Sequence, residues 1–444
     1  MVAHESPINP ASPPRSHTTR HKSRHIARLS NVPLLGRSAL FSRIQQAASQ
    51  APPGGSFPNL TAFLQLGKWL LPYLRDFFHK DHPYQTYPAG KTGLFDISTA
   101  HGNGPLRIAV TADWATGTLE AETVAANMQA CSPHYTLHLG DVYYMGEARE
   151  IGENCLGTPA NNYAGVRWPK GLLGSFALMG NHEMYSGGKG YFTTFLNELG
   201  ILSSGKVTDP QSASYFCLEN AHWLLLGLDT GYHSGGLPVL GSIPLLNQIP
   251  SLNVDARFDP IMLAWLNQLT ETLQAAGSGQ KPVVVLTHHQ PVSSFDQAYQ
   301  KPAQQLAEWG FLNGREFVWL FGHEHRLAIY KEQTIANTLR AYPRCIGHGG
   351  MPVDLTRLKQ PDPNVLYYDP RQHPIDKDDL KTQVGYNGHV VLIFNRTKLT
   401  IEYRDIVNNG LLLTETFTPE GSGALHHSSS KPPNSPLLSG DQTS

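Results

Sequence analysis

Short apolar runs in the middle of the chain are each followed at once by a polar motif. The runs are LRIAV, YTLHL, SFALM, VVVL and FVWLF, whose β-branched and aromatic residues predict strands buried on both faces. The motifs that follow contain Asp113 (TADWATG), Asp141 (GDVYY), Asn181 (GNHE), His288 and His289 (THHQP), and His323 and His325 (GHEH). Because functional groups gather at the carboxyl ends of strands in α/β sheets, we expect these side chains to meet at one sheet edge as a metal site.

Further apolar patterns predict helices between these strands and a second set of strands after them. Apolar residues three and four apart mark the helical segments TLEAETVAANMQA, GYFTTFLNELG, IMLAWLNQLTETLQAA and PAQQLAEWGFL. Runs without helices between them are YFCLE, HWLLLGLD, LAIYK, GHVVLIFN, KLTIEYRD and LLLTETF. Turn signals at Asn395-Arg396 and Asn409-Gly410 predict hairpins. We expect a second, antiparallel sheet that packs on the first, with helices outside.

Composition divides the chain into four parts. Residues 1–57 are rich in Pro, Ser, His and Arg and are expected to form a disordered basic tail. Residues 58–104 hold a helical segment, LTAFLQLGKWLLPYLRDFFHK, whose apolar face packs on the next domain or lies on a membrane surface. Residues 105–419 form the strand-and-helix domain, and the low-complexity residues 420–444 are expected to be a second disordered tail.

Charge and cysteine content narrow the class of protein only slightly. With 34 Lys+Arg and 35 Asp+Glu the net charge is -1, so we expect no stable nucleic acid or membrane partner. Cys131, Cys155, Cys217 and Cys345 are widely spaced and form no CxxC, which is typical of free thiols in a reducing compartment. No apolar stretch has the length of a membrane span or signal peptide, so we expect a cytoplasmic protein, with secretion by another route left open.

The ordered motifs GDxxY, GNHE, a strand-end His before x-Pro, and GHxH resemble those of the calcineurin-like metallophosphoesterases. The resemblance covers about residues 105–350. It implies an α/β fold, namely a four-layer α-β-β-α sandwich with a dinuclear metal site at the carboxyl ends of the strands. It also implies a hydrolase that acts on a small-molecule phosphate ester.

The first motif departs from the usual pattern of that superfamily. Most members have Asp-x-His there, whereas this chain has Asp113-Trp114-Ala115, and alanine offers no donor atom. In the purple acid phosphatase branch, a small residue stands at this position and the tyrosine of GDxxY binds a ferric ion. Tyr144 occupies that tyrosine position here. Together Ala115 and Tyr144 resemble the purple acid phosphatase-like arrangement.

Carried over to this chain, the resemblance implies two sets of metal ligands that share Asp141. The first metal is expected to bind Asp113, Asp141, Tyr144 and His325, and the second Asp141, Asn181, His289 and His323. His288 and His289 both follow the fourth strand, and the family's placement of the ligand two residues before proline selects His289. Carboxylate, phenolate and imidazole donors suit iron, manganese or zinc.

The implied reaction is hydrolysis by a metal-bridging hydroxide, with a phosphomonoester as the favoured substrate. His182 is expected to protonate the leaving oxygen, with Glu183 orienting its ring. Two other functions stay open. The same metals also suit a phosphodiesterase or nuclease, and a protein in which Ala115 marks a disabled metal would bind phosphate ligands without cleaving them.

Several residues have both a functional and a structural interpretation. Asp113 and Asp141 suit helix N-caps as well as metal ligands. Trp114 suits either stacking on an aromatic leaving group or packing on the domain, and His348 either lines the cleft or is an incidental residue of a glycine-rich turn. The insertion at about residues 230–260 is expected to rim the cleft because it is rich in glycine and proline.

Overall fold

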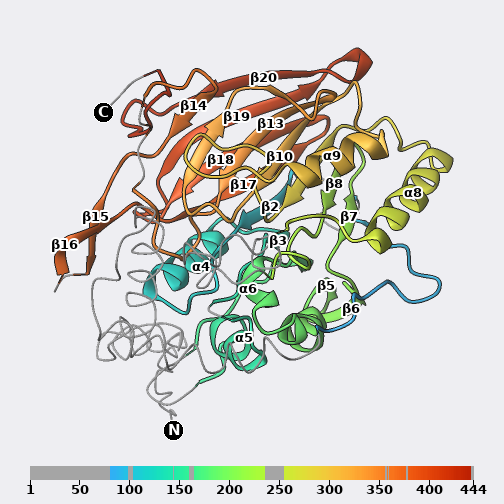
Figure 1. Ribbon diagram of the computed structural model, residues 1–444, viewed down its shortest axis with the longest axis horizontal. Helices are drawn as coiled ribbons and strands as arrows, with labels where there is room; N and C mark the ends of the chain where they lie inside the picture. Colours follow the sequence, from blue (N-terminus) through green and yellow to red (C-terminus); the bar gives the residue numbers. More distant parts are fainter. Residues whose placement is uncertain are drawn as a thin grey trace, which may run out of the picture.

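The computed structural model describes residues 81–98, 104–143, 145–159, 165–235, 255–355, 358, 360–376 and 379–441. Within them, two sheets of nine strands each pack face to face with helices on their outer sides (Figure 1). Among the helices of these residues, none has both the length and the apolar character needed to cross a membrane. The predicted basic tail 1–57 and the amphipathic segment 60–80 lie outside the described residues.

The first sheet is built around three parallel strands. Its order is β20-β19-β18-β17-β2-β3-β4-β5-β6, in which β2, β3 and β4 run parallel and the other neighbours pair antiparallel. The strands are β2 (Leu106–Thr111), β3 (Tyr135–His138), β4 (Gly174–Ala177), β5 (Gly200–Ser203), β6 (Lys206–Pro210), β17 (Gly388–Asn395), β18 (Lys398–Asp405), β19 (Leu411–Pro419) and β20 (Leu425–Ser430).

The second sheet has four adjacent parallel strands, β8-β9-β10-β13, with antiparallel neighbours on both sides. Its strands are β1 (Leu94–Asp96), β7 (Phe216–Glu219), β8 (Leu224–Gly227), β9 (Val283–Thr287), β10 (Glu316–Phe321), β11 (Leu327–Tyr330), β12 (Gln333–Ile335), β13 (Leu339–Ile346) and β14 (Val365–Tyr368). A separate hairpin joins β15 (His373–Asp376) and β16 (Asp379–Val384).

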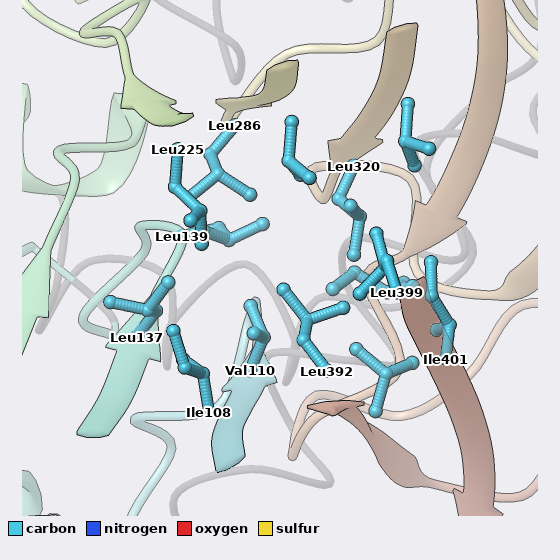
Figure 2. Packing of buried hydrophobic residues seen from close by; sticks show 14 of the residues in the cluster. Ile108, Val110, Leu137, Leu139, Leu225, Leu286, Leu320, Leu392, Leu399 and Ile401 are labelled. Atoms are coloured by element: carbon cyan, nitrogen blue, oxygen red, sulfur yellow. The ribbon is translucent and has the colours of Figure 1, made fainter. Parts of the chain in front are cut away.

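The core between the two sheets consists of side chains at alternate strand positions. Ile108 and Leu137 from the first sheet meet Leu225, Leu286 and Leu320 from the second (Figure 2). On β9, Val284 and Leu286 face this core, whereas Val283 and Val285 face the helices on the other side. This alternation shows that both faces of the sheet are covered, which produces the continuous apolar run in the sequence.

Helices cover both outer faces and complete the four layers. The second sheet is covered by α8 (Pro260–Ala275) and α9 (Gln300–Trp309), and the first by α4 (Leu119–Ala130) and α5 (Ala148–Asn154). Short helical turns are α6 (Asn181–Met184), the π-helix Tyr191–Phe195, and the 3-10 helices Leu196–Glu198 and Gly421–Gly423. The predicted four-layer α-β-β-α sandwich is confirmed.

One detail of the predicted sheet organisation is wrong. The hairpins of residues 388–417 do not form a separate antiparallel sheet, because β17 pairs with β2, Val390 opposite Val110, and so extends the first sheet. Segment GYFTTFLNELG, expected to be helical, is so as a π-helix and a 3-10 turn, and its threonines and aromatics are weak α-helix formers.

The predicted boundaries of the domain are also too narrow. Residues 420–441 were expected in a disordered tail, but β20 pairs with β19, and Leu425 and Leu437 are buried in the inter-sheet core. At the other end, β1 pairs with β7 and belongs to the second sheet, although it falls in the predicted linker 58–104. These anchors were missed because their apolar stretches are too short to give a periodic signal.

Candidate metal centre

The five polar motifs meet where the carboxyl ends of strands from both sheets come together. Asp113, Asp141 and Asn181 follow β2, β3 and β4 of the first sheet, whereas His288 and His323 follow β9 and β10 of the second. We expected a single sheet edge. The site instead spans the two sheets, so each sheet supplies only part of the donor set.

Three of these residues have a backbone conformation that is rare outside glycine. The φ angles are 55° at Asp113, 73° at Asp141 and 64° at His323. Residues held in such regions cost on the order of 1–3 kcal/mol each and persist only where neighbouring contacts fix them. Here the N–H of His323 donates to Asp113 Oδ2 at 2.9 Å, and the N–H of His182 donates to Asp141 Oδ1 at 3.0 Å. The turns after the strands therefore aim the side chains inward.

Glycines that precede the functional residues allow these close contacts. A Cβ at Gly180 would lie 2.1 Å from Asp141 Oδ1, and one at Gly322 would lie 2.5 Å from Asp113 Oδ2. No side chain fits at those distances without displacing a carboxylate. The glycines of GNHE and GHEH are thus required by the packing of the two aspartates.

One group of donors surrounds the phenol of Tyr143. Its hydroxyl lies 3.0 Å from Asp113 Oδ1, 3.2 Å from Asp141 Oδ2 and 3.0 Å from His325 Nε2, and the side chain is fully buried. Tyr144, the tyrosine expected as a ligand from the motif, lies outside the described residues. The GDxxY pattern picks only the second of two adjacent tyrosines, whereas the structure places the first, Tyr143, among these donors.

A second group surrounds His288. Its Nε2 lies 3.2 Å from Asn181 Oδ1 and 3.4 Å from Asp141 Oδ1, while its Nδ1 lies 2.9 Å from the carbonyl oxygen of Leu139. A backbone carbonyl on one ring nitrogen is the usual support of an imidazole that binds metal through the other. The structure therefore brings His288, the alternative to the expected His289, next to Asp141 and Asn181.

His289 also lies in the site. Potential ligand atoms of His288, His289 and His323 are all within 4.8 Å of one another, as are those of Asp113, Asp141 and His288. His289 Nδ1 lies 2.9 Å from Thr230 Oγ1, and its buried Nε2 has no hydrogen-bond partner. Sequence reasoning missed Thr230, although it follows the strand run HWLLLGLD as the other motifs follow theirs.

His182 and Glu183 lie on α6 at the edge of the first group. The His182 ring is 4.4 Å from the Tyr143 ring, and its Nε2 is 3.8 Å from Asp141 Oδ2. Glu183 was expected to orient His182. Its carboxylate accepts hydrogen bonds from the N–H groups of Val142 and Gly180, at 3.1 and 3.0 Å, and so braces the turns that follow β3 and β4. Burial, reinforced by Asp141, raises the pKa of Glu183 to about 8.

Electrostatics of the site favour a bound cation. Burial opposes ionisation of Asp141, but His288 and His182 overcome it and hold the pKa of this carboxyl well below its usual range. Burial keeps the pKa values of His289 and His323 low, so these imidazoles are neutral, the form that binds metal. Buried carboxylates, neutral imidazoles and the orphaned Nε2 of His289 together fit metal ions.

The structure also places Trp114, His348 and the insertion, for which the sequence allowed a role in the cleft. Trp114 is fully buried, donates from Nε1 to the carbonyl oxygen of Ala121 at 2.6 Å and packs edge-on against Trp168, so it belongs to the core. His348 is buried beside Gly388. Of the predicted cleft insertion, residues 236–254 lie outside the described part, while Gly231 and Gly235 pack on Gly180 and Met184.

Comparisons with known proteins give one family match. A family model described as calcineurin-like phosphoesterase matches residues 106–327, which is 222 of 444 residues. No curated protein matches the chain.

Three solved structures are among those to which the chain is similar. GAP50, the anchor in the inner membrane complex of Plasmodium, is 11% identical, with a TM-score of 0.42 over 72% of this chain and 91% of that chain. A purple acid phosphatase from yellow lupin (Lupinus luteus) seeds is 10% identical, with a TM-score of 0.41 over 70% and 53%. A dimetal phosphatase from Danio rerio is 13% identical, with a TM-score of 0.36 over 68% and 97%.

Proposed function

Since this chain belongs to the calcineurin-like phosphoesterase family and is a hydrolase of phosphoric ester bonds, we propose that it is a dinuclear metal phosphomonoesterase of the purple acid phosphatase-like type. One observation carries the proposal. The Tyr143 hydroxyl lies within 3.2 Å of Asp113, Asp141 and His325, so a phenol stands among the donors where Ala115 offers none.

We assign two ligand sets that share Asp141. The first metal is held by Asp113, Asp141, Tyr143 and His325, and the second by Asp141, Asn181, His288 and His323. Tyr143 replaces the expected Tyr144, and His288 replaces the expected His289. Carboxylate and phenol oxygens with imidazole nitrogens suit iron, manganese or zinc.

When bound, two metal ions supply a water of lowered pKa and neutralise charge on the phosphate. Side chains of the protein donate a proton, fix the turns of the site and contact the substrate. Asp141 contacts both ligand sets, His182 lies beside it as the proton donor for the leaving oxygen, and Glu183 fixes the two turns that carry them. His289, anchored by Thr230, directs its unpartnered Nε2 toward the cluster as a further contact for the substrate.

The test compares Tyr143→Phe with Tyr144→Phe as a matched pair. We expect the wild type, purified without chelator, to contain about two metals including iron and to show a visible tyrosinate band. Tyr143→Phe should lose the band, one metal and most hydrolysis of p-nitrophenyl phosphate, while Tyr144→Phe retains all three. The reverse result would return the ligand role to Tyr144, and no effect in either variant would remove the phenol from the centre.

The same assay addresses the alternative substrate class. A bis(p-nitrophenyl) phosphate rate above that of the monoester would identify a phosphodiesterase or nuclease with the same metals. We also propose a cytoplasmic location, supported by the free thiols of all four cysteines.

A further inference from the structure

Tyr299 is a polar residue beside the metal cluster that belongs to none of the five motifs. Its hydroxyl lies 3.1 Å from His323 Nε2, and its ring centroid lies 4.8 Å from that of His289 in an edge-to-face arrangement. Tyr299 is half-buried, whereas His289 is buried. His323 is likewise half-buried, so the phenol lies with the His323 ring on the more exposed side of the site, where a substrate can enter.

The segment that carries Tyr299 is held in place at both ends. The N–H of Tyr299 donates to the carbonyl oxygen of Gln290 at 2.9 Å, and Gln290 Nε2 donates to the carbonyl oxygen of Gln297 at 2.8 Å. Directly after Tyr299, α9 begins and packs on the second sheet through Pro302, Ala303 and Leu306. The loop after β9 thus returns its last residue to the site at a fixed position.

Contacts other than Tyr299 also hold His323 in place. Its backbone N–H is bound to Asp113, and its ring packs against those of His288 and His289 at 5.2 and 4.5 Å. A tyrosine phenol has an ordinary pKa of about 10, so it carries its proton throughout the neutral and acidic range. Tyr299 is thus a neutral hydrogen-bond donor beside the proposed metal cluster.

We propose that Tyr299 binds the substrate by donating a hydrogen bond from its hydroxyl to a phosphoryl oxygen. The proposal rests on the function proposed above. Phosphoryl oxygens are strong acceptors, and a hydrogen bond to a charged group is stronger than one between neutral groups. The ring of Tyr299 and the imidazole of His289 then form a wall of the phosphate site on the side of the second sheet.

The test measures binding of orthophosphate by the full-length, metal-loaded protein with calorimetry, which needs no turnover. Tyr299→Phe removes only the hydroxyl and is expected to weaken orthophosphate binding by about 10- to 100-fold. KM for p-nitrophenyl phosphate should rise, with metal content and unfolding midpoint unchanged. The control is Tyr367→Phe, another half-buried tyrosine that packs on Lys431 at the edge strand β14, and it should behave as wild type.

Two results would overturn the proposal. Orthophosphate binding within about twofold of wild type would show that the phenol does not contact phosphate. Loss of metal from Tyr299→Phe, restored together with phosphate binding by excess metal, would show that Tyr299 only positions His323. If the wild type binds orthophosphate but cleaves neither ester, the proposed function fails, while the comparison of phosphate affinities still decides the role of Tyr299.

Discussion

Arg344 and Glu415 form a two-pronged ion pair in the core between the two sheets. Nε and Nη2 of Arg344, on β13, each donate to a Glu415 oxygen at 2.6 Å, and both side chains are fully buried. Glu415, on β19, also accepts hydrogen bonds from Tyr403 Oη at 2.6 Å and His427 Nε2 at 2.7 Å. The buried charges are thus paired and satisfied by partners from both sheets.

Removing one member of this pair should destabilise the protein strongly. Arg344→Met leaves the Glu415 charge buried and is expected to lower the free energy of unfolding by about 3–5 kcal/mol. The double variant Arg344→Met/Glu415→Leu should recover most of that loss. Lys91→Met, which breaks the exposed pair with Asp209, is the control and should cost less than about 1 kcal/mol. Denaturant unfolding measures the free energy of unfolding of all three variants. Equal losses of stability in Arg344→Met and Lys91→Met would contradict the expectation.

Buried histidines should make the fold sensitive to mild acid. Burial, with His348 and Arg404 nearby, lowers the pKa of His389 to about 3, from an ordinary value near 6.5. Because the unfolded chain takes up this proton first, the stabilising contribution is complete above pH 6.5 and is lost as the pH falls toward 3.

The test of this sensitivity uses metal-free protein, so that loss of metal does not contribute. We expect His389→Leu to reduce the slope of unfolding free energy against pH below about 6.5 by up to about 1.4 kcal/mol per pH unit. Parallel curves for the variant and wild type would show that His389 does not titrate on unfolding.

Glu415 should make the stability of the fold depend on pH at lower pH values than His389 does. Burial opposes its ionisation, but Arg344 and His427 lower its pKa to about 2. Its contribution is therefore present above the unfolded pKa of about 4.3 and is lost as the pH falls toward 2. In Glu415→Gln this acid-dependent loss should disappear. A wild-type curve that is flat between pH 4 and 2 would contradict the assignment.

A methyl group at Gly180 should damage the metal centre. The Cβ of Gly180→Ala would lie 2.1 Å from Asp141 Oδ1, so the carboxylate or the turn must move. We expect at least one metal to be lost and stability to fall by about 1–3 kcal/mol. Gly421→Ala is the control, since a Cβ there meets no atom within 4 Å. Normal metal content in Gly180→Ala would show that the turn relaxes without cost to the site.

Replacement of the two adjacent histidines should separate their roles. His288→Ala should remove about one metal per chain and lower activity by about 100-fold or more, because Asp141 and Asn181 lose their neighbour. His289→Ala should keep both metals and weaken phosphate binding. Elemental analysis of the two purified variants shows which histidine holds a metal. Metal loss only in His289→Ala would restore His289, the residue expected from the sequence, as the ligand.

The sequence predicted the strands well because both faces of each central strand are covered, which leaves an uninterrupted apolar run. It did not predict which sheet each strand joins, since the pairing of β17 with β2 joins residues far apart in the chain.

The sequence also did not predict which of two adjacent residues of the same type enters the metal site. The directions of His288 and His289 are set by Leu139 and Thr230, which follow the strands β3 and β8. The direction of Tyr143 follows from the left-handed turn at Asp141, which the motif letters do not encode.

The pairing of β2 with β17 also has a consequence for synthesis of the chain. Leu106–Thr111 is made early, but its antiparallel neighbour Gly388–Asn395 emerges from the ribosome only after all the motif residues. Until then one edge of an apolar strand is open to pairing with other chains. Termination after His325 and before residue 388 therefore yields a product that holds every proposed ligand and yet exposes a template for aggregation.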